Sequence, residues 1–167
     1  YKKRTKMTSK VHLAYIACIG SGVIGSGWIA RFIENGVNVN IYDPDPKAKL
    51  SVERTLENAH IAYDNLTSIP RLKKGQIYFK KSINETVTDV DLVIESVPER
   101  LDIKQKVYKE IEEYCDESTL ITSSTSGIIP SKLQKKFKYP DRFYVGHPFN
   151  PVYLLPLVEI VGGSKTS

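Results

Sequence analysis

A histidine and a glutamate near the end of the chain have the types and spacing of an acid–base pair. His147 lies in the segment Gly146-His147-Pro148-Phe149-Asn150-Pro151, which we expect to form a conformationally restricted turn after a strand. Glu159 lies in the apolar segment that follows, and a chain reversal between Pro151 and Pro156 would bring it beside His147. A carboxylate bonded to one imidazole nitrogen fixes the tautomer and raises the basicity of the other nitrogen. The pair therefore predicts a general base that removes the proton of an alcohol.

Two further polar side chains are expected close to this pair. Ser126 lies in the polar run that follows an apolar strand, and Asn150 lies three residues after His147. These side chains could hold an alcohol or carbonyl oxygen, which suits hydride transfer to a nicotinamide while the base takes the O–H proton. The alternative is a structural histidine with a satisfied hydrogen bond, which residue type alone would favour. Catalysis is favoured because the pair shares one edge of the predicted sheet with a dinucleotide motif.

Three glycines near the start of the chain form that dinucleotide motif. Gly20, Gly22 and Gly25 match G-x-G-x-x-G and lie between an apolar strand and an amphipathic helix. In such a turn the glycines allow a sharp bend, the approach of a pyrophosphate and close packing of the helix, whose free N–H groups face the phosphates. Asp43 follows Gly25 by 18 residues, near the spacing of about 20 for an acid that binds a ribose. A plain strand–helix turn would leave Asp43 unexplained, and its carboxylate favours NAD because it repels the 2′-phosphate of NADP. The predicted cofactor site also includes the first helical residues, Val23 and Ile24.

Apolar strands alternate with amphipathic helices along the chain, and these elements must position the side chains described above. Such alternation predicts an α/β fold of the Rossmann type, with a doubly wound and mostly parallel sheet. Open sheets of this kind bind ligands at the carboxyl ends of their strands, where these polar residues are expected. We predict strands at residues 11–19, 37–42, 77–81, 91–97, 120–123, 142–146 and 155–161. We predict helices at residues 23–35, 46–66, 82–87, 100–114 and 130–137, with the basic run 135–138 as the exposed face of the last helix and 71–75 as a solvated turn.

Composition restricts the class of protein. With 167 residues, 41% hydrophobic and 26% charged, the chain suits one globular α/β domain. Four of the five excess positive charges lie in residues 1–6, so residues 1–10 are interpreted as a basic extension and 11–167 as the domain. We expect no nucleic-acid partner, although a basic head that binds polyanions is the alternative. No apolar run approaches about 18 residues, so no membrane span is expected. Cys18 and Cys115 have neither metal nor redox spacing, which predicts reduced thiols, no metal and a cytoplasmic protein.

Several motifs together carry a resemblance to a known family. The segments GSGVIG, ESVPER, SSTSG and GHPFNPVYLLPLVEIVGG occur in this order, with Asp43 after the first of them. Over residues 11–167 the chain resembles the 3-hydroxyacyl-CoA dehydrogenase superfamily, and its last two motifs look most like the carnitine 3-dehydrogenase branch. The resemblance implies NAD as cofactor and a small 3-hydroxy acid, L-carnitine, as substrate. A 3-hydroxyacyl-CoA dehydrogenase and a non-catalytic dinucleotide-binding protein are the alternatives.

The resemblance also implies roles for particular residues. His147 and Glu159 match the catalytic pair, Ser126 matches a serine that contacts the substrate and the nicotinamide region, and Asn150 matches the active-site asparagine. Asp43 matches the acid on the adenosine ribose. The remaining assignments are Glu99 and Lys104 near the cofactor, and Ser124, Phe149 and Tyr153 near the substrate.

Two departures from the superfamily pattern bear on the substrate. Ser124 stands where the acyl-CoA enzymes have asparagine, and Gly127 where they have serine, which argues against a thioester. A quaternary ammonium is held well against aromatic faces, which Phe149 and Tyr153 offer, although packing of the turn explains them equally. The resemblance further implies a helical C-terminal domain that completes the substrate cleft and forms a homodimer. We therefore expect this chain to bind NAD and to turn over poorly.

Overall fold

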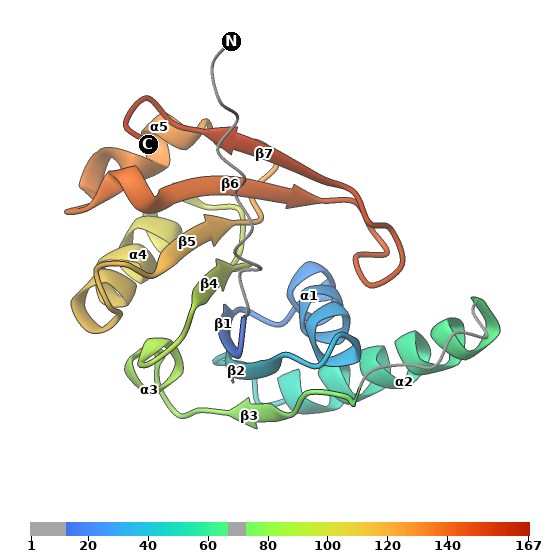
Figure 1. Cartoon of the computed structure of the whole chain (residues 1–167). Coiled ribbons are helices and arrows are strands. Elements are labelled where there is room, and N and C mark those ends of the chain that lie inside the picture. Colours follow the sequence, from blue (N-terminus) through green and yellow to red (C-terminus); the bar gives the residue numbers. More distant parts are fainter. Residues whose placement is uncertain (1–12, 67–72) are drawn as a thin grey trace, which may run out of the picture.

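The computed structural model describes residues 13–66 and 73–167, and it shows one sheet with helices on both faces (Figure 1). Its strand order is β3-β2-β1-β4-β5-β6-β7. The first six strands pair in parallel, and β7 pairs antiparallel with β6. The strands are β1 (Tyr15–Ile19), β2 (Asn38–Tyr42), β3 (Ile77–Phe79), β4 (Leu92–Glu95), β5 (Leu120–Ser123), β6 (Phe143–Pro148) and β7 (Val158–Gly162). This order confirms the predicted Rossmann-type sheet, in which strand order reverses between β1 and β4.

The helices divide between the two faces of the sheet and make two cores. They are α1 (Val23–Glu34), α2 (Ala48–Leu66), α3 (Ile83–Val87), α4 (Leu101–Tyr114) and α5 (Pro130–Leu133). One apolar cluster joins α1 and α2 to one face of the sheet through Trp28, Ile29 and Val52. The other joins α3, α4 and α5 to the opposite face through Val87, Ile111 and Leu133. Near-continuous apolar strands such as β1 suit this arrangement because they are buried on both faces.

Most predicted elements are present, with ends that shift for local reasons. The strand at 120–123 and the helix at 23–35 agree with β5 and α1 to within a residue. The first strand begins at Tyr15 rather than before it, and Val11 and His12 lie outside the described residues, as does part of the predicted turn at 71–75. The Asp91 carboxylate accepts hydrogen bonds from the N–H groups of Ala14 and Tyr15, at 2.8 and 3.1 Å, where the strand starts. The strand predicted at 91–97 ends at Glu95, whose own carboxylate takes the N–H of Val97.

The last two strands differ from the prediction at the residues of most interest. The predicted turn at 146–151 is wrong at its start, because β6 continues through His147 to Pro148. The antiparallel partner β7 extends the ladder, with His147 opposite Glu159. The strand predicted from residue 155 starts only at Val158, since Pro156 lacks the N–H that a ladder needs. The antiparallel pairing of β6 with β7 confirms the predicted chain reversal. Each residue of β7 is exposed.

The segment after α5 corrects another prediction. The α-helix ends at Leu133 and continues as a 3₁₀ turn over Gln134–Lys136. Phe137, predicted to be on a wet face, is buried. Its ring lies 4.8 Å from that of Tyr108 and 4.7 Å from that of Phe143. The three aromatic rings therefore form part of the core under α4, and only the neighbouring lysines are exposed.

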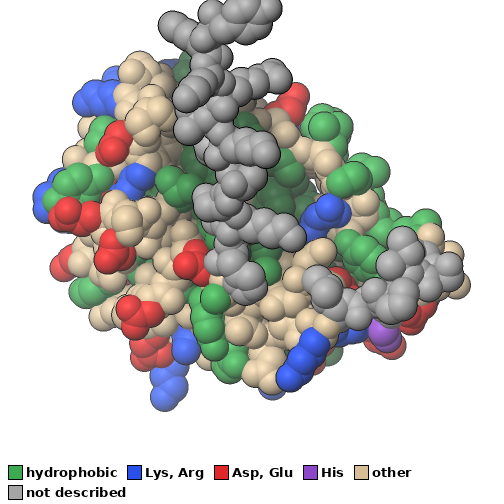
Figure 2. Space-filling view, viewed as in Figure 1, with side chains coloured by type: hydrophobic (Ala, Val, Ile, Leu, Met, Phe, Trp, Pro, Cys, Tyr) green, Lys and Arg blue, Asp and Glu red, His purple; other side chains and the backbone are tan. Residues whose placement is uncertain are grey.

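The surface carries both signs of charge. On the face in Figure 2, basic and acidic side chains are interspersed over the described elements. Among residues 13–66 and 73–167, no helix combines the length and the apolar character needed to cross a membrane.

Candidate active site at the carboxyl edge of the sheet

The glycine-rich turn leads from β1 into α1 with the geometry that the motif predicts. Gly20 has φ +87°, a conformation that L side chains rarely adopt, and α1 begins directly after Gly22. A Cβ on Gly25 would lie 2.0 Å from the carbonyl oxygen of Gly20, whereas a Cβ on Gly22 would meet nothing within 4 Å. Gly25 is therefore required for packing, and Gly22 borders open space.

Asp43 lies against this turn at the end of β2. Its Oδ2 accepts hydrogen bonds from the backbone N–H of Ser21 at 2.6 Å and from the Ser21 hydroxyl at 2.9 Å. Its Oδ1 accepts one from the N–H of Asp45 at 2.9 Å. The carboxylate thus joins the ends of β1 and β2 at the predicted ribose position.

A cavity of about 690 Å³ opens beside these residues and has the properties of a dinucleotide site. Gly20, Gly22 and Asp43 line it, together with Ser96 after β4 and side chains of α4 that include Ile103 and Val107. Its volume is typical of small-molecule pockets, which span about 300–1,000 Å³. The open side of Gly22 and the free N–H groups at the start of α1 suit a pyrophosphate, so the residues fit NAD. Val23 is exposed and Ile24 half-buried on the first turn of α1.

His147 and Glu159 face each other across the β6–β7 ladder. The Nδ1 of His147 lies 3.0 Å from Oε2 of Glu159. In a neutral imidazole that donates to a carboxylate through Nδ1, Nε2 is the nitrogen with a lone pair. Both side chains line a cavity of about 260 Å³ together with Ser126. The structure therefore brings together three of the four predicted catalytic side chains, and Asn150 lies exposed at the start of the following turn.

The loop that carries Ser126 is held by Glu99. Oε1 of Glu99 accepts hydrogen bonds from the Thr125 hydroxyl, the N–H of Ser126 at 3.1 Å and the N–H of Gly127 at 2.8 Å. Partial burial by itself raises the pKa of the Glu99 carboxyl, but the bonds from Thr125 and Gly127, with the charge of Lys104, together lower it. Glu99 is thus held as a carboxylate beside the predicted active-site loop.

Lys104 is buried under this loop. Its side chain is 1% exposed, and its ammonium lies 2.7 Å from Oε1 of Glu95 and 3.4 Å from Oε2 of Glu99. Glu95 is also fully buried and accepts hydrogen bonds from the hydroxyls of Tyr108 and Ser123. Desolvation, reinforced by the Glu95 carboxylate, raises the pKa of Tyr108. The charge of Lys104 is therefore matched by two carboxylates, those of Glu95 and Glu99.

The three residues expected near the substrate occupy different positions. Ser124 is half-buried and accepts a hydrogen bond from Nε1 of Trp28 at 3.1 Å. The Phe149 ring is 38% exposed and meets the imidazole of His147 edge-on, at 6.0 Å between centroids. Tyr153 lies farther along the turn, half-buried, with its carbonyl directed at α1 and α2. Of the two aromatic residues among these three, Phe149 is the one whose ring contacts the acid–base pair.

Among the described residues, this edge of the sheet offers neither a reactive thiol nor a cluster of metal ligands. Burial, with the carboxylates of Asp43 and Glu95 nearby, raises the pKa of Cys18, so this thiol stays protonated. No cluster of histidine, cysteine and carboxylate side chains suitable for a metal ion occurs within 13–66 and 73–167.

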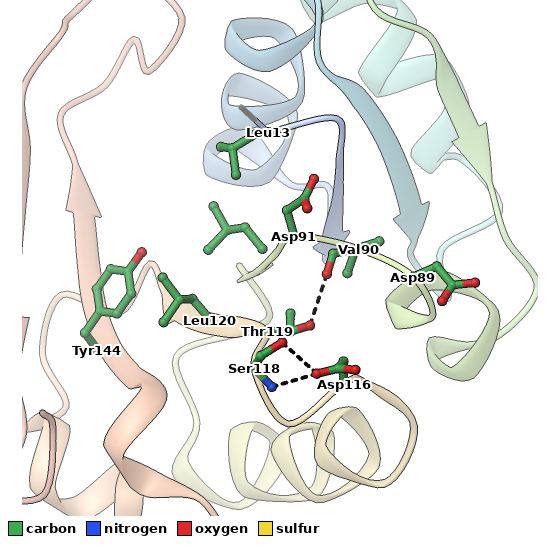
Figure 3. A pocket seen from close by; sticks show the side chains of 10 residues that line it. Leu13, Asp89, Val90, Asp91, Asp116, Ser118, Thr119, Leu120 and Tyr144 are labelled. Atoms are coloured by element: carbon green, nitrogen blue, oxygen red, sulfur yellow. Dashed lines mark hydrogen bonds between the residues drawn. The ribbon is translucent and has the colours of Figure 1, made fainter. Parts of the chain in front are cut away.

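A further cavity, of about 610 Å³, lies at the opposite, amino edge of the sheet (Figure 3). Its polar groups are used locally: Asp116 accepts from Ser118, and the Thr119 hydroxyl donates to the carbonyl of Val90. No residue predicted to do chemistry lines it.

Sequence reasoning missed the contacts among Glu95, Glu99 and Lys104. A signal was present, because Glu95 is a charged residue inside the otherwise apolar strand DLVIESV, and a buried charge needs a partner. The hydrogen bond from Trp28 to Ser124 was missed as well, since the two residues are 96 positions apart.

Known proteins resemble the chain in sequence. A sequence model described as the NAD binding domain of 3-hydroxyacyl-CoA dehydrogenase matches residues 15–167. The L-carnitine dehydrogenase/betainyl-CoA thioesterase of Rhizobium meliloti (strain 1021) is 52% identical over 151 residues, which cover 90% of this chain and 30% of that protein. The L-carnitine dehydrogenase of Oceanobacillus iheyensis is 50% identical over 152 residues, 91% of this chain and 50% of that protein. The chain thus spans half or less of the length of these relatives.

Solved structures share the fold. A 5-formyl-3-hydroxy-2-methylpyridine 4-carboxylic acid 5-dehydrogenase, described as an NAD⁺-dependent dismutase, superposes with a TM-score of 0.85 at 36% identity, covering 93% of this chain and 51% of that one. The 3-hydroxybutyryl-CoA dehydrogenase of Escherichia coli K12 superposes with a TM-score of 0.78 at 27% identity, covering 94% of this chain and 34% of that one.

Proposed function

Since the chain belongs to the 3-hydroxyacyl-CoA dehydrogenase family, of which it comprises the NAD-binding domain, we propose that it forms the cofactor half of an enzyme that oxidises the 3-hydroxy group of L-carnitine. The observation that carries this proposal is the contact between His147 and Glu159, beside a cavity that Ser126 also lines. Relatives named L-carnitine dehydrogenase, at about 50% identity over 90% of the chain, support the choice of substrate.

The proposed mechanism gives each group one task. When bound, NAD supplies the hydride acceptor. His147 takes the hydroxyl proton through Nε2, and Glu159 holds the imidazole and balances its positive charge. Ser126 and Asn150 hold the substrate oxygen.

Binding is divided among the remaining predicted residues. The glycine turn with Val23 and Ile24 receives the pyrophosphate, and Asp43 the adenosine ribose. Glu99 and Lys104 lie beside the cofactor. The quaternary ammonium of carnitine packs against Phe149, which lies beside His147. Tyr153 and Ser124 contribute to the substrate region from their separate positions.

The proposal extends to the rest of the protein. Residues 11–167 form the NAD-binding domain after a basic extension at 1–10, and a helical domain outside this sequence completes the substrate cleft and forms a cytoplasmic homodimer. The exposed, largely apolar β7 supports a further domain, and two free thiols at Cys18 and Cys115 support a reducing compartment. Light scattering of the full-length protein tests the dimer.

A substrate panel tests the activity. The full-length protein is assayed with L-carnitine and NAD, and in the reverse direction with acetoacetyl-CoA and NADH. We expect the full-length protein to turn over L-carnitine and not acetoacetyl-CoA. The 167-residue chain should bind NAD but oxidise carnitine poorly. Turnover of acetoacetyl-CoA alone would assign the protein to thioester chemistry, and NAD binding without any turnover would leave a non-catalytic dinucleotide-binding protein.

Replacement of the proposed base gives a second measurement. We expect His147→Gln to lower kcat by about 10²–10⁴-fold, the usual contribution of a positioned general base, while NAD still binds. His60→Gln is the matched control, because His60 lies on α2 beside Lys74. Equal activity in the two variants would contradict the assigned role.

A further inference from the structure

The turn between β6 and β7, residues 149–157, packs against α1, the helix that follows the glycine-rich turn. Figure 1 shows it leaving the sheet and reaching toward α1 and α2. Val152 in this turn is 1% exposed and belongs to the apolar cluster of Trp28 and Ile29. The turn that follows His147 is therefore fixed on α1 by a buried side chain.

Gly27 makes this packing possible. A Cβ on Gly27 would lie 2.9 Å from Cβ of Val152 and 3.1 Å from its Cγ2. Carbon atoms in contact prefer about 3.5–4.0 Å, so even one methyl group would displace Val152 by roughly 0.6 Å. The stiff, β-branched valine cannot avoid this contact by rotating a flexible end.

A second contact fixes the next residue of the turn. The carbonyl of Tyr153 accepts hydrogen bonds from the Tyr63 hydroxyl of α2, at 2.5 Å, and from Nη1 of Arg31 in α1, at 3.4 Å. Two consecutive residues of the turn are thus held, Val152 by packing on α1 and Tyr153 by side chains of α1 and α2.

We propose that Gly27 and Val152 are positioning residues, which set the distance between the cofactor-binding turn and the His147–Glu159 pair. This inference rests on the proposed function. His147 precedes Val152 by five residues and Glu159 follows it by seven, so one side chain locates both arms of the hairpin. Neither Gly27 nor Val152 lines the cavity that holds the pair. Their effect on the reaction is therefore geometric.

Helix propensity argues in the same direction. Glycine inside a helix is less favourable than alanine by about 1 kcal/mol, and Gly27 neither caps α1 nor has a positive φ. The close approach of Val152 is the feature at this position that requires glycine. A substitution that stabilises the helix itself should therefore impair the reaction.

A size-swap experiment in the full-length enzyme tests this. We expect Gly27→Ala to lower kcat by about tenfold, since a misplacement of about 1 Å can cost 10²-fold, with the KM for NAD unchanged. Val152→Ala would keep the Cβ that lies 2.9 Å from the new methyl, so the rescue variant is Gly27→Ala/Val152→Gly. It removes both that Cβ and its methyls and should restore most of kcat. Val39→Ala, which truncates another fully buried valine of the same cluster, is the matched control for stability and should leave kcat unchanged.

The outcomes separate positioning from packing. Unchanged kcat in Gly27→Ala, or a double variant no better than the single one, would overturn the proposal. So would a fall of kcat in Val39→Ala that matches its fall in thermal stability, because the effect would then follow stability alone.

A readout without turnover separates this inference from the proposed function. In the 167-residue chain, the imidazole NMR signals of His147 should shift in Gly27→Ala and return in the double variant, while those of His60 stay constant. If the wild-type enzyme oxidises no 3-hydroxy substrate, the proposed function fails. The NMR series then still decides whether the contact places His147, and an unshifted His147 signal would refute it.

Discussion

Glu99 connects two loops at the carboxyl edge of the sheet through a single carboxylate. It follows β4, and it accepts hydrogen bonds from Thr125, Ser126 and Gly127 after β5. The ammonium of Lys104 lies 3.4 Å from its other oxygen, Oε2. Glu99, which the sequence predicts to lie near the cofactor, therefore also holds the backbone of Ser126 through its carboxylate.

Glu99→Gln tests this dependence through pH. The pKa of Glu99 is lower in the folded protein than its ordinary value of 4.5, so the unfolded chain takes up the proton first as pH falls. The stabilisation is complete above 4.5 and is lost as pH falls through the lower, folded pKa. We expect Glu99→Gln to reduce the free energy of unfolding at pH 7 by at most about 1 kcal/mol, because the side chain is 42% exposed and solvent screens it.

Urea unfolding at pH 7 and at pH 3 measures this effect. The difference between wild type and Glu99→Gln should shrink at the lower pH. Glu53→Gln, on the exposed face of α2 beside Lys49, is the control and should change little at either pH. A difference that grows toward acid would contradict a lowered pKa of Glu99 in the folded protein.

At the scale of elements, α1 organises the carboxyl edge. It starts directly after Gly22, which lines the cavity of about 690 Å³, Trp28 binds Ser124 after β5, and Gly27 accommodates the turn after β6. Ser124 also contacts the Ser96 hydroxyl after β4, at 2.9 Å. One helix thereby contacts the loops that follow several strands, so its position determines the geometry of the whole edge.

Two glycines of the cofactor turn should respond differently to alanine. We expect Gly22→Ala to keep the thermal stability of the chain and to weaken NAD binding by at least about tenfold, or 1.4 kcal/mol, since its Cβ would enter open space where the phosphates approach. Gly25→Ala should also weaken NAD binding. In addition it should lower the free energy of unfolding by roughly 1–3 kcal/mol, because its Cβ would collide with the carbonyl of Gly20. NAD titration and thermal unfolding of the same samples separate the two effects, and identical behaviour of the two variants would refute this division of roles.

The whole molecule shows where sequence reasoning succeeds. The alternation of apolar strands and amphipathic helices is a local signal, and so is the glycine turn, so the sheet and the turn around Gly20 were predictable. The pairing of His147 with Glu159 was predictable because only 12 residues separate them and prolines favour a reversal between.

Sequence reasoning fails where long-range packing decides. The burial of Lys104 and Phe137 depends on neighbours distant in sequence, and the extension of β6 through His147 depends on its antiparallel partner. The fit of Val152 to Gly27 joins positions 125 residues apart. A glycine inside a helix, without a capping role, was the one local hint of that close approach.

Strand β7 has a consequence for handling the protein. Its outer edge is unpaired in the described sheet, and Val158, Ile160 and Val161 are exposed along it. An open edge with apolar side chains is a template for pairing with another chain, and natural proteins commonly block such edges with lysine. We expect Ile160→Lys to keep the melting temperature and to reduce concentration-dependent light scattering, whereas Ile160→Val should scatter like wild type. Equal scattering by all three proteins would mean that their colloidal behaviour at high concentration is set elsewhere on the surface; a drop in the lysine variant alone would identify this edge as the limit on solubility.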